Sequence, residues 1–213
     1  MKIGVLGSGK VAITLADGFL KHGYEVMVGS RTPGKLAEWN AKNPKASTGT
    51  FNAAAAFGNL IVLVVKGSVA SDVLQLAGAE NLKGKTIIDV CNPFAGEPSA
   101  NGVFPLFTNA NESLMERLQT EYEGARFVKA FNSVGYAVMD NPKFKDGKPT
   151  MFICGNNQAA KDTVRGILDQ FGWETADMGS AEAARAIEPL AVLWCIHGFT
   201  RNQWTHAFKL LIH

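Results

Sequence analysis

The sequence predicts an α/β fold with a doubly wound, mostly parallel sheet, extra C-terminal strands and a helical tail. Short apolar runs alternate with helical patterns up to about position 133, which is typical of parallel strands joined by right-handed crossovers. A glycine-rich turn separates the first apolar run from the first helical pattern. The run at 60–65, LIVLVV, is uninterrupted, as expected for a parallel strand buried on both faces.

The first strand and helix enclose a dinucleotide-binding fingerprint. The apolar run at 3–6 is followed by Gly7, Gly9 and Ala12, in the spacing G-x-G-x-x-A of Rossmann-type domains. Gly7 permits a tight turn, and Gly9 lets the backbone approach a pyrophosphate, which the helix N-terminus then attracts. The alternative is a strand–turn–helix whose glycines serve only packing. The strand before the motif and the helical pattern after it favour nucleotide binding.

The end of the second strand, at 25–28, indicates which dinucleotide is bound. NAD sites place a carboxylate there, whereas this chain continues Ser30, Arg31, Thr32. An arginine offers a planar cationic fork to a 2′-phosphate, and Lys35 adds a second charge nearby. We therefore expect selectivity for NADP(H). The alternative is a solvated arginine beside a turn.

The remaining elements follow in order. In the part up to position 133 we expect a polar helix at 33–43, an edge strand at 47–50, a helix at 52–57 capped by Asn52, a strand at 60–65, a helix from Ser68 or Ser71 to about Ala79, a strand at 85–90, a helix at 111–123 and a strand at 126–131. Ligands of such sheets bind at the carboxyl ends of the strands. The nicotinamide is therefore expected beyond the strands at 60–65 and 85–90.

The C-terminal part is predicted to complete the sheet and to supply an interface. We expect strands at 150–154 and 173–178 around a helix at 157–170, and a helical tail at 180–212 that Pro189 breaks or kinks. The tail is rich in Trp and Phe, which is typical of a core or a homodimer contact. Residues 1–213 are interpreted as one domain, with a dinucleotide-binding core at 1–133 and an extension at 134–213.

Composition limits the classes of function. A net charge of +2 gives no reason to expect nucleic acid or an anionic membrane as partner, and no run of about 18 apolar residues predicts a membrane span. Cys91, Cys154 and Cys195 form no metal-spaced pair, so we expect no metal site and reduced thiols in a cytoplasmic protein. The first strand is predicted to begin within the first residues, so we expect no cleaved targeting segment.

These motifs together resemble a known family. GxGxxA, VGSR, VVKGS, IIDVCNP and VKAFNSVG are similar to segments of the deazaflavin (coenzyme F420)-dependent NADP reductases and of the NADPH-binding reductase domain of STEAP metalloreductases. The resemblance spans most of the chain and is most specific in the nucleotide half. It implies that NADPH lies along the strand ends and that a flavin-like ring stacks on the nicotinamide, with direct hydride transfer between them.

The resemblance also implies a role for each matching residue. It assigns the pyrophosphate to Gly7, Ser8, Gly9, Lys10 and Val11, the 2′-phosphate to Ser30, Arg31 and Thr32, the nicotinamide side to Val65, Lys66, Asn92 and Pro93, and the second ring to Ala130, Phe131, Asn132 and Ser133.

The chain departs from the family in the acceptor half. It has Lys66 where the family has proline, Lys129-Ala130 where the family has His-Thr, and Glu188-Pro189 where the family has Thr-Pro. These departures leave the acceptor open. Lys66 could meet an anionic substrate or act as a general acid, and the alternative is a solvated lysine. None of the histidines has a partner that suggests a catalytic triad.

Three functions are compatible with these observations. The first is an NADP(H)-dependent oxidoreductase that transfers hydride between nicotinamide and a flavin- or deazaflavin-like acceptor. The second is an NADPH-dependent reductase of a small carbonyl or imine, with Lys66 or Asn132 polarising the substrate. The third is a non-catalytic NADP(H)-binding redox sensor.

Overall fold

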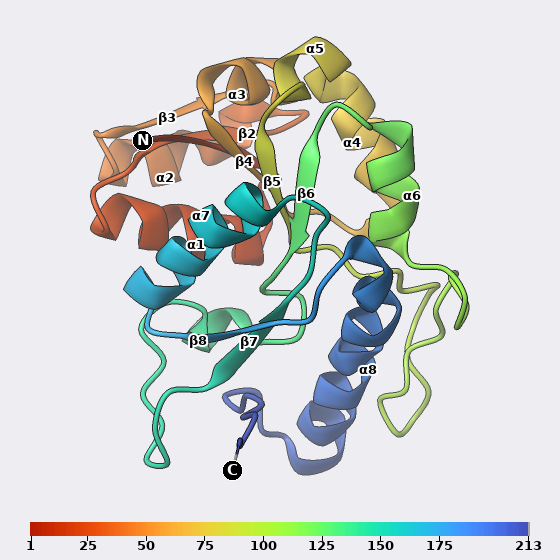
Figure 1. The fold of residues 1–213 in the computed structure, drawn as a ribbon. Helices are drawn as coiled ribbons and strands as arrows, with labels where there is room; N and C mark the ends of the chain where they lie inside the picture. The colour runs from red at the N-terminus through yellow and green to blue at the C-terminus, as the bar shows by residue number, and fades with distance from the viewer. Residues whose placement is uncertain (213) are drawn as a thin grey trace.

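The computed structural model describes residues 1–212 and contains the predicted doubly wound sheet (Figure 1). Six strands pair in parallel in the order β3-β2-β1-β4-β5-β6. They are β1 (Lys2–Leu6), β2 (Glu25–Gly29), β3 (Ala46–Gly49), β4 (Leu60–Leu63), β5 (Thr86–Asp89) and β6 (Arg126–Lys129). The strand order reverses between β1 and β4, the position at which such sheets bind ligands.

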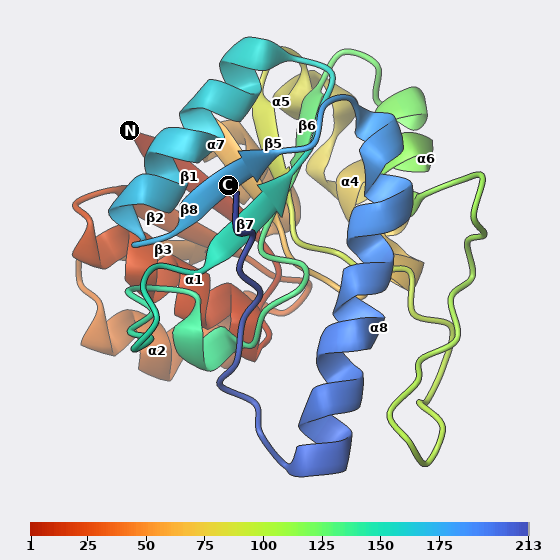
Figure 2. The ribbon, with the colours of Figure 1, turned by 60° about the horizontal axis from the view of Figure 1, so that its bottom comes forward.

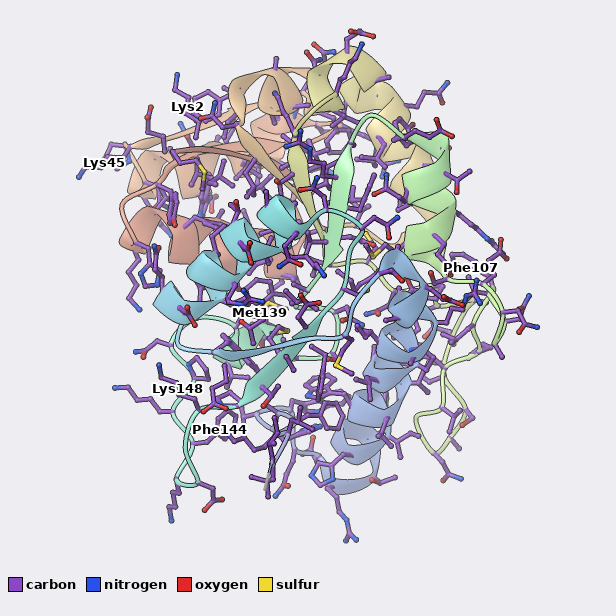
Figure 3. All side chains as sticks on the ribbon, in the orientation of Figure 1. Lys2, Lys45, Phe107, Met139, Phe144 and Lys148 are labelled. Carbon is purple, nitrogen blue, oxygen red and sulfur yellow. The ribbon has the colours of Figure 1, made fainter. Side chains whose placement is uncertain are left out.

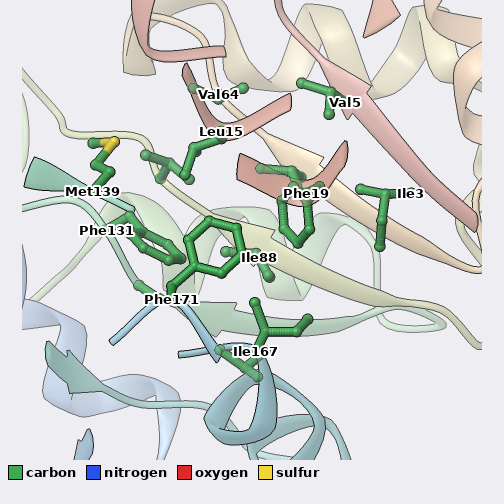
Figure 4. Packing of buried hydrophobic residues seen from close by; sticks show 14 of the residues in the cluster. Ile3, Val5, Leu15, Phe19, Val64, Ile88, Phe131, Met139, Ile167 and Phe171 are labelled. Atoms are coloured by element: carbon green, nitrogen blue, oxygen red, sulfur yellow. The ribbon is translucent and has the colours of Figure 1, made fainter. Parts of the chain in front are cut away.

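Helices cover both faces of the sheet. The connecting helices are α1 (Lys10–Lys21), α2 (Ala37–Lys42), α3 (Phe51–Phe57), α4 (Ala70–Ala77), α5 (Ala79–Leu82) and α6 (Leu114–Glu121), with short 3₁₀ turns η1 (Pro33–Leu36), η2 (Gly67–Val69) and η3 (Tyr136–Val138). Successive side chains of a strand point to opposite faces. Val62 therefore joins the core on the α1 face, while Ile61 and Leu63 join the core on the α4 face. Figure 4 shows the first of these cores.

Several helix ends differ from the prediction. Thr50, not Asn52, caps α3, because the Thr50 hydroxyl accepts a hydrogen bond from the backbone amide of Ala53. The side-chain Nδ2 of Asn52 instead donates to the Ala77 carbonyl. The helix expected to reach Ala79 stops at Ala77, since Gly78 adopts a positive φ of 87°.

Two further helices are shorter than predicted. The expected helix at 33–43 begins as the 3₁₀ turn η1 before α2. The expected helix at 111–123 begins only at Leu114, where Ser113 and Glu116 form a capping box.

The C-terminal strands do not complete the main sheet. β7 (Thr150–Ile153) and β8 (Glu174–Asp177) pair with each other in parallel, and α7 (Gln158–Gln170) connects them. One antiparallel bridge, between Lys129 and Cys154, links them to β6. The reason lies just beyond β6, where Phe131 has a φ of 60° and turns the chain out of the sheet, so that β7 returns across the end of β6. In the loop before β7, Figure 3 shows Met139 inside the molecule and Phe144 at its periphery.

The predicted helical tail is wrong beyond Arg201. After the turn η4 (Ala181–Ala183), α8 (Ala184–Arg201) runs through Pro189 and ends where Asn202 adopts left-handed backbone angles. The chain then folds back toward β7 (Figure 2), where the Thr150 amide donates to the Phe208 carbonyl at 2.9 Å. His213 lies outside the described residues. Within residues 1–212, no helix is both long and apolar enough to cross a membrane.

Candidate active site

The glycine loop joins three strand ends at the carboxyl edge of the sheet. The Gly7 amide donates to the Gly29 carbonyl at 3.2 Å, which ties the end of β1 to the end of β2. A Cβ on Gly7 would lie 2.2 Å from the Val64 carbonyl oxygen beyond β4, and Gly7 has a φ of 147°. Only glycine fits this position, as the fingerprint predicts.

The start of α1 offers free amides to an anion. Within the described chain, the amides of Gly9, Lys10 and Val11 have no protein partner, and the first turn carries no acidic residue. A Cβ on Gly9 would meet no atom within 4 Å, so the space above the loop is open. These residues fit a pyrophosphate group, because orphan amides and the helix dipole both favour negative charge.

The end of β2 combines one structural serine with exposed cationic residues. Ser30 is buried, its hydroxyl lies 3.1 Å from that of Ser8, and it accepts the Thr32 amide at 3.1 Å. Ser30 thus braces the glycine loop. Arg31 and Lys35 are exposed and form no salt bridge with any residue in 1–212, so both charges are available to a phosphate.

Lys10 extends from the first turn of α1 toward η3. Its ammonium group lies 4.0 Å from the centroid of the exposed Tyr136 ring, a cation–π contact. The charge of Lys10 therefore lies between the phosphate loop and the segment that follows β6.

The loops beyond β4 and β5 are in close contact. A Cβ on Gly67 would lie 2.1 Å from the Asn92 carbonyl oxygen, so these loops approach at a glycine. Lys66 is exposed beside this contact, Val65 is half-buried, and Pro93 is buried.

The segment after β6 is covered by protein. Ala130, Phe131, Asn132 and Ser133 are all buried. The Phe131 ring packs against Phe171, with ring centroids 5.8 Å apart (Figure 4), so it points into the core and away from the strand ends. A second ring could therefore not stack on the Phe131 side chain in this arrangement.

An amide bridge joins the ends of β5 and β6 to α8; we use this name for Asn92, Asn132 and the Ile187 carbonyl. Asn92 Nδ2 donates to the Asn132 carbonyl at 2.8 Å, and Asn132 Nδ2 donates to Asn92 Oδ1 at 3.1 Å and to the Ile187 carbonyl at 2.9 Å. Both acceptors of Nδ2 are carbonyl oxygens, which fixes the orientation of the Asn132 amide. Asn132 Oδ1 has no partner within the described residues.

A buried ion cluster of Lys129, Asp89 and Glu188 lies next to the amide bridge in sequence. Lys129 Nζ is 2.6 Å from Asp89 Oδ2 and 2.9 Å from Glu188 Oε1, and it donates to the Cys91 carbonyl at 2.9 Å. All three side chains are at most 1% exposed. Burial is the largest influence on the pKa of Lys129 and lowers it, but the two carboxylates outweigh burial and raise this pKa above its ordinary value.

No role for this cluster was predicted from the sequence, although the sequence contains a signal of it. Lys129 interrupts the apolar run of β6, and Asp89 is its direct register partner on β5. A lysine inside a buried strand needs a carboxylate partner, which the parallel register supplies. Glu188, on a distant helix, could not be placed beside them from the sequence.

The other titratable groups lie away from the strand ends or are inert. His22 pairs with Asp140 at 2.8 Å behind α1. The three cysteines are buried and free, and burial raises their pKa values, to about 11 for Cys195 and about 12 for Cys154. No group of three or more His, Cys, Asp or Glu side chains within residues 1–212 is arranged to hold a metal ion.

Comparison with known proteins shows which proteins this chain is similar to. Residues 2–93 match the family model described as NADP oxidoreductase, coenzyme F420-dependent. A crystal structure of a protein from Arthrobacter sp. FB24, assigned as an F420-dependent NADP-reductase, is 31% identical, superposes with a TM-score of 0.92, and each chain covers 100% of the other.

Two further similar proteins are longer than this chain. Metalloreductase STEAP3 of Rattus norvegicus is 33% identical over 90% of this chain, which spans 37% of that protein. An imine reductase from Aspergillus terreus, solved in complex with NADPH4, is 21% identical with a TM-score of 0.68, over 94% of this chain and 63% of that one. The last similarity shows a shared fold only.

Proposed function

Because the chain belongs to the coenzyme F420-dependent NADP oxidoreductase family, we propose that it is an NADPH-dependent oxidoreductase that passes a hydride to a flavin- or deazaflavin-like acceptor. One observation carries the choice of cofactor. The end of β2 presents Arg31 and no carboxylate, beside an open loop of unpaired amides.

The residues at the strand ends divide the cofactor between them. The amides of Gly9, Lys10 and Val11 hold the pyrophosphate, and the exposed cations at the end of β2 hold the 2′-phosphate. The loops at 65–67 and 91–93 lie against the nicotinamide. Ser30 contributes by bracing the glycine loop.

The chemistry of the bound cofactor is hydride transfer, in which NADPH, the oxidised acceptor and a proton give NADP⁺ and the reduced acceptor. The protein orients the nicotinamide and excludes water from it. The described strand ends present no histidine or carboxylate to a substrate, and Lys66 is the exposed candidate for proton transfer. A flavin-like acceptor needs little help with protons, which supports this class.

Two other functions remain as competing proposals. A reductase of a small carbonyl or imine would use Lys66 as general acid, because both hydrogens of Asn132 Nδ2 are already donated within the protein and cannot polarise a substrate in this arrangement. A redox sensor would bind NADP(H) without turning over an acceptor. The fold shared with imine reductases supports neither, because it carries no residue-level correspondence.

A stopped-flow experiment distinguishes the three. The protein is mixed with NADPH and, separately, with deazaflavin, FMN, FAD, ferric chelates and small ketones, and the NADPH absorbance is followed. Fast oxidation by deazaflavin or a flavin is expected. Oxidation only by a ketone would favour the reductase of a small carbonyl, with Lys66 as general acid. Tight NADPH binding without oxidation would favour the redox sensor.

We also propose that α8 contributes to a homodimer, as a contact between two copies of this chain. Leu193, on the outer face of α8, is 54% exposed, and no charged residue lies on that face between Arg185 and Arg201. Leu193→Asp is expected to shift the protein to monomer in sedimentation velocity. Leu76→Asp on α4, where the leucine is 55% exposed, is the matched control and should leave the dimer intact. A native protein that sediments as a monomer would contradict this proposal.

A further inference from the structure

We propose that the ion cluster holds the nicotinamide side of the site in its working geometry, which makes Lys129 a positioning residue for hydride transfer. The inference rests on the proposed function, because it concerns the side of the site where the nicotinamide would lie. It is carried by the way the cluster and the amide bridge are connected.

The ammonium group of Lys129 is surrounded by protein oxygens. It donates to the Cys91 carbonyl at 2.9 Å and lies 2.6 Å from Asp89 Oδ2 and 2.9 Å from Glu188 Oε1. Lys129 is also completely buried. Lys129 therefore acts through its neighbours and not on the reacting atoms.

The cluster controls the backbone that leads to Asn92. The Cys91 amide donates to Asp89 Oδ1 at 2.9 Å, and the Cys91 carbonyl accepts from Lys129. Both backbone polar groups of Cys91 are thus bound by the cluster. Asn92 is the next residue, so its position depends on the ion pair.

The amide bridge repeats the same three-way connection just beyond the strand ends. The cluster joins the last residues of β5 and β6 to α8 through residues 89, 129 and 188. The bridge joins the segments that follow β5 and β6 to α8 through residues 92, 132 and 187. A shift in the first layer is transmitted directly to the second, because Glu188 and Ile187 are adjacent in α8.

Burying the three charged side chains of the ion cluster costs desolvation free energy. Two carboxylates and one ammonium leave one net negative charge, which backbone amides offset. Glu188 accepts the amides of Leu114 and Met115 at 2.9 and 3.0 Å, at the start of α6. Apolar side chains often fill such a site with equal or greater stability, so a specific geometry is the reason we infer for its presence.

The test compares two ligands that differ in the nicotinamide. NADPH would contact both the phosphate half of the site, which is the glycine loop and the end of β2, and the nicotinamide half beyond β4, β5 and β6. In contrast, 2′,5′-ADP would contact only the phosphate half. Calorimetry gives the Kd of 2′,5′-ADP, NADPH fluorescence gives the Kd of NADPH, and stopped flow with FMN or deazaflavin gives the hydride-transfer rate. The variants are Glu188→Gln, which conserves shape, and Lys129→Met, which removes the charge.

A second buried lysine provides the matched control. Lys161 on α7 is 6% exposed, pairs with Asp177 at 3.0 Å and donates to the Gly179 carbonyl at 3.2 Å. This pair lies between α7 and β8, and within residues 1–212 neither side chain forms a hydrogen bond or ion pair with the main sheet. Lys161→Met therefore reports the effect of removing a buried lysine from its ion pair at a place away from the candidate site.

The proposal predicts that both cluster variants keep the Kd of 2′,5′-ADP within about twofold, weaken NADPH about tenfold and slow hydride transfer roughly 100-fold at saturating NADPH. Lys161→Met should lower Tm but leave both Kd values and the rate unchanged. The proposal is overturned if the cluster variants lower Tm and change neither the ratio of the two Kd values nor the rate.

Two outcomes keep this test separate from the proposed function. If native protein transfers hydride to no acceptor, the proposed function fails, and the ratio of the two Kd values still tests the cluster. If Lys129→Met does not fold, Glu188→Gln decides alone, since its amide can still accept from Lys129 and from one backbone amide.

Discussion

The two halves of the candidate site are built in opposite ways. The phosphate half is open: its amides are unpaired, Gly9 faces empty space, and Arg31 and Lys35 are exposed. The nicotinamide half is closed: Asn132 is 6% exposed, and the ion cluster beneath it is fully buried. Binding a charged phosphate needs accessible hydrogen-bond donors whose bound water the phosphate can replace. Orienting a reacting ring needs surrounding residues that are held rigidly in place.

The two glycines of the fingerprint give the sharpest contrast between fold and ligand binding. Gly7→Ala places a methyl group 2.2 Å from a backbone oxygen at a φ of 147°, and we expect a loss of about 2 kcal/mol or more of unfolding free energy. Gly9→Ala meets no protein atom, so urea denaturation should give native stability while calorimetry shows weakened NADPH binding. Equal destabilisation by both changes would break the comparison.

Arg31→Ala tests the selectivity of the open half. A charge-assisted contact contributes roughly 1.5–3 kcal/mol, so NADPH binding should weaken about 10- to 100-fold, and NADH binding should hardly change. Fluorescence titration with each cofactor measures this. The matched variant Lys35→Ala is expected to weaken NADPH binding less than Arg31→Ala, because Lys35 is expected to be the second and more distant charge. Equal losses for NADPH and NADH would remove the argument from the missing carboxylate.

Asp140 tests the stability of the face behind the site. Burial is the largest influence on its pKa and raises it, but hydrogen bonds from Lys21 and His22 outweigh burial, so the pKa lies below its ordinary value. A depressed carboxylate pKa stabilises the fold above the unfolded-state pKa, and this contribution is lost as pH falls through the folded-state value. Asp140→Asn should lower Tm near neutral pH, and the difference from native protein should close in acid. A difference that grows in acid would contradict this assignment.

Lys66→Met is the smallest expected effect. Lys66 is exposed, and hydride transfer to a flavin-like ring requires no general acid from it, so the rate with FMN should change less than about twofold. A loss of 100-fold or more, with a matching change in the pH–rate profile, would instead identify Lys66 as an acid.

The sequence predicted the main sheet because its signals are local. The glycine spacing, the apolar run at 60–65 and the missing carboxylate after β2 each lie within a few residues, and the family model matches residues 2–93 in this half. It could not predict the closed half. Glu188 reaches Lys129 only after the chain has left the sheet, formed β7, α7 and β8, and returned as α8.

The errors at the C-terminal end have the same origin. The apolar pattern of the tail is compatible with a continuous helix, but Asn202 ends α8 and the following residues pack on α8 and β7. β7 and β8 were correctly predicted as strands, yet their separation from the main sheet depends on the turn at Phe131, a non-glycine residue with positive φ. Propensity does not predict such a turn.

The position of Glu188 also sets an order of assembly. During synthesis, Asp89 and Lys129 emerge long before α8, so they can pair first and leave α6 without the acceptor for its first amides. Only docking of the last helix supplies the third member. Without a docked α8, the ion cluster would lack Glu188 and the amide bridge would lack the Ile187 carbonyl, so nicotinamide binding would report on completed folding.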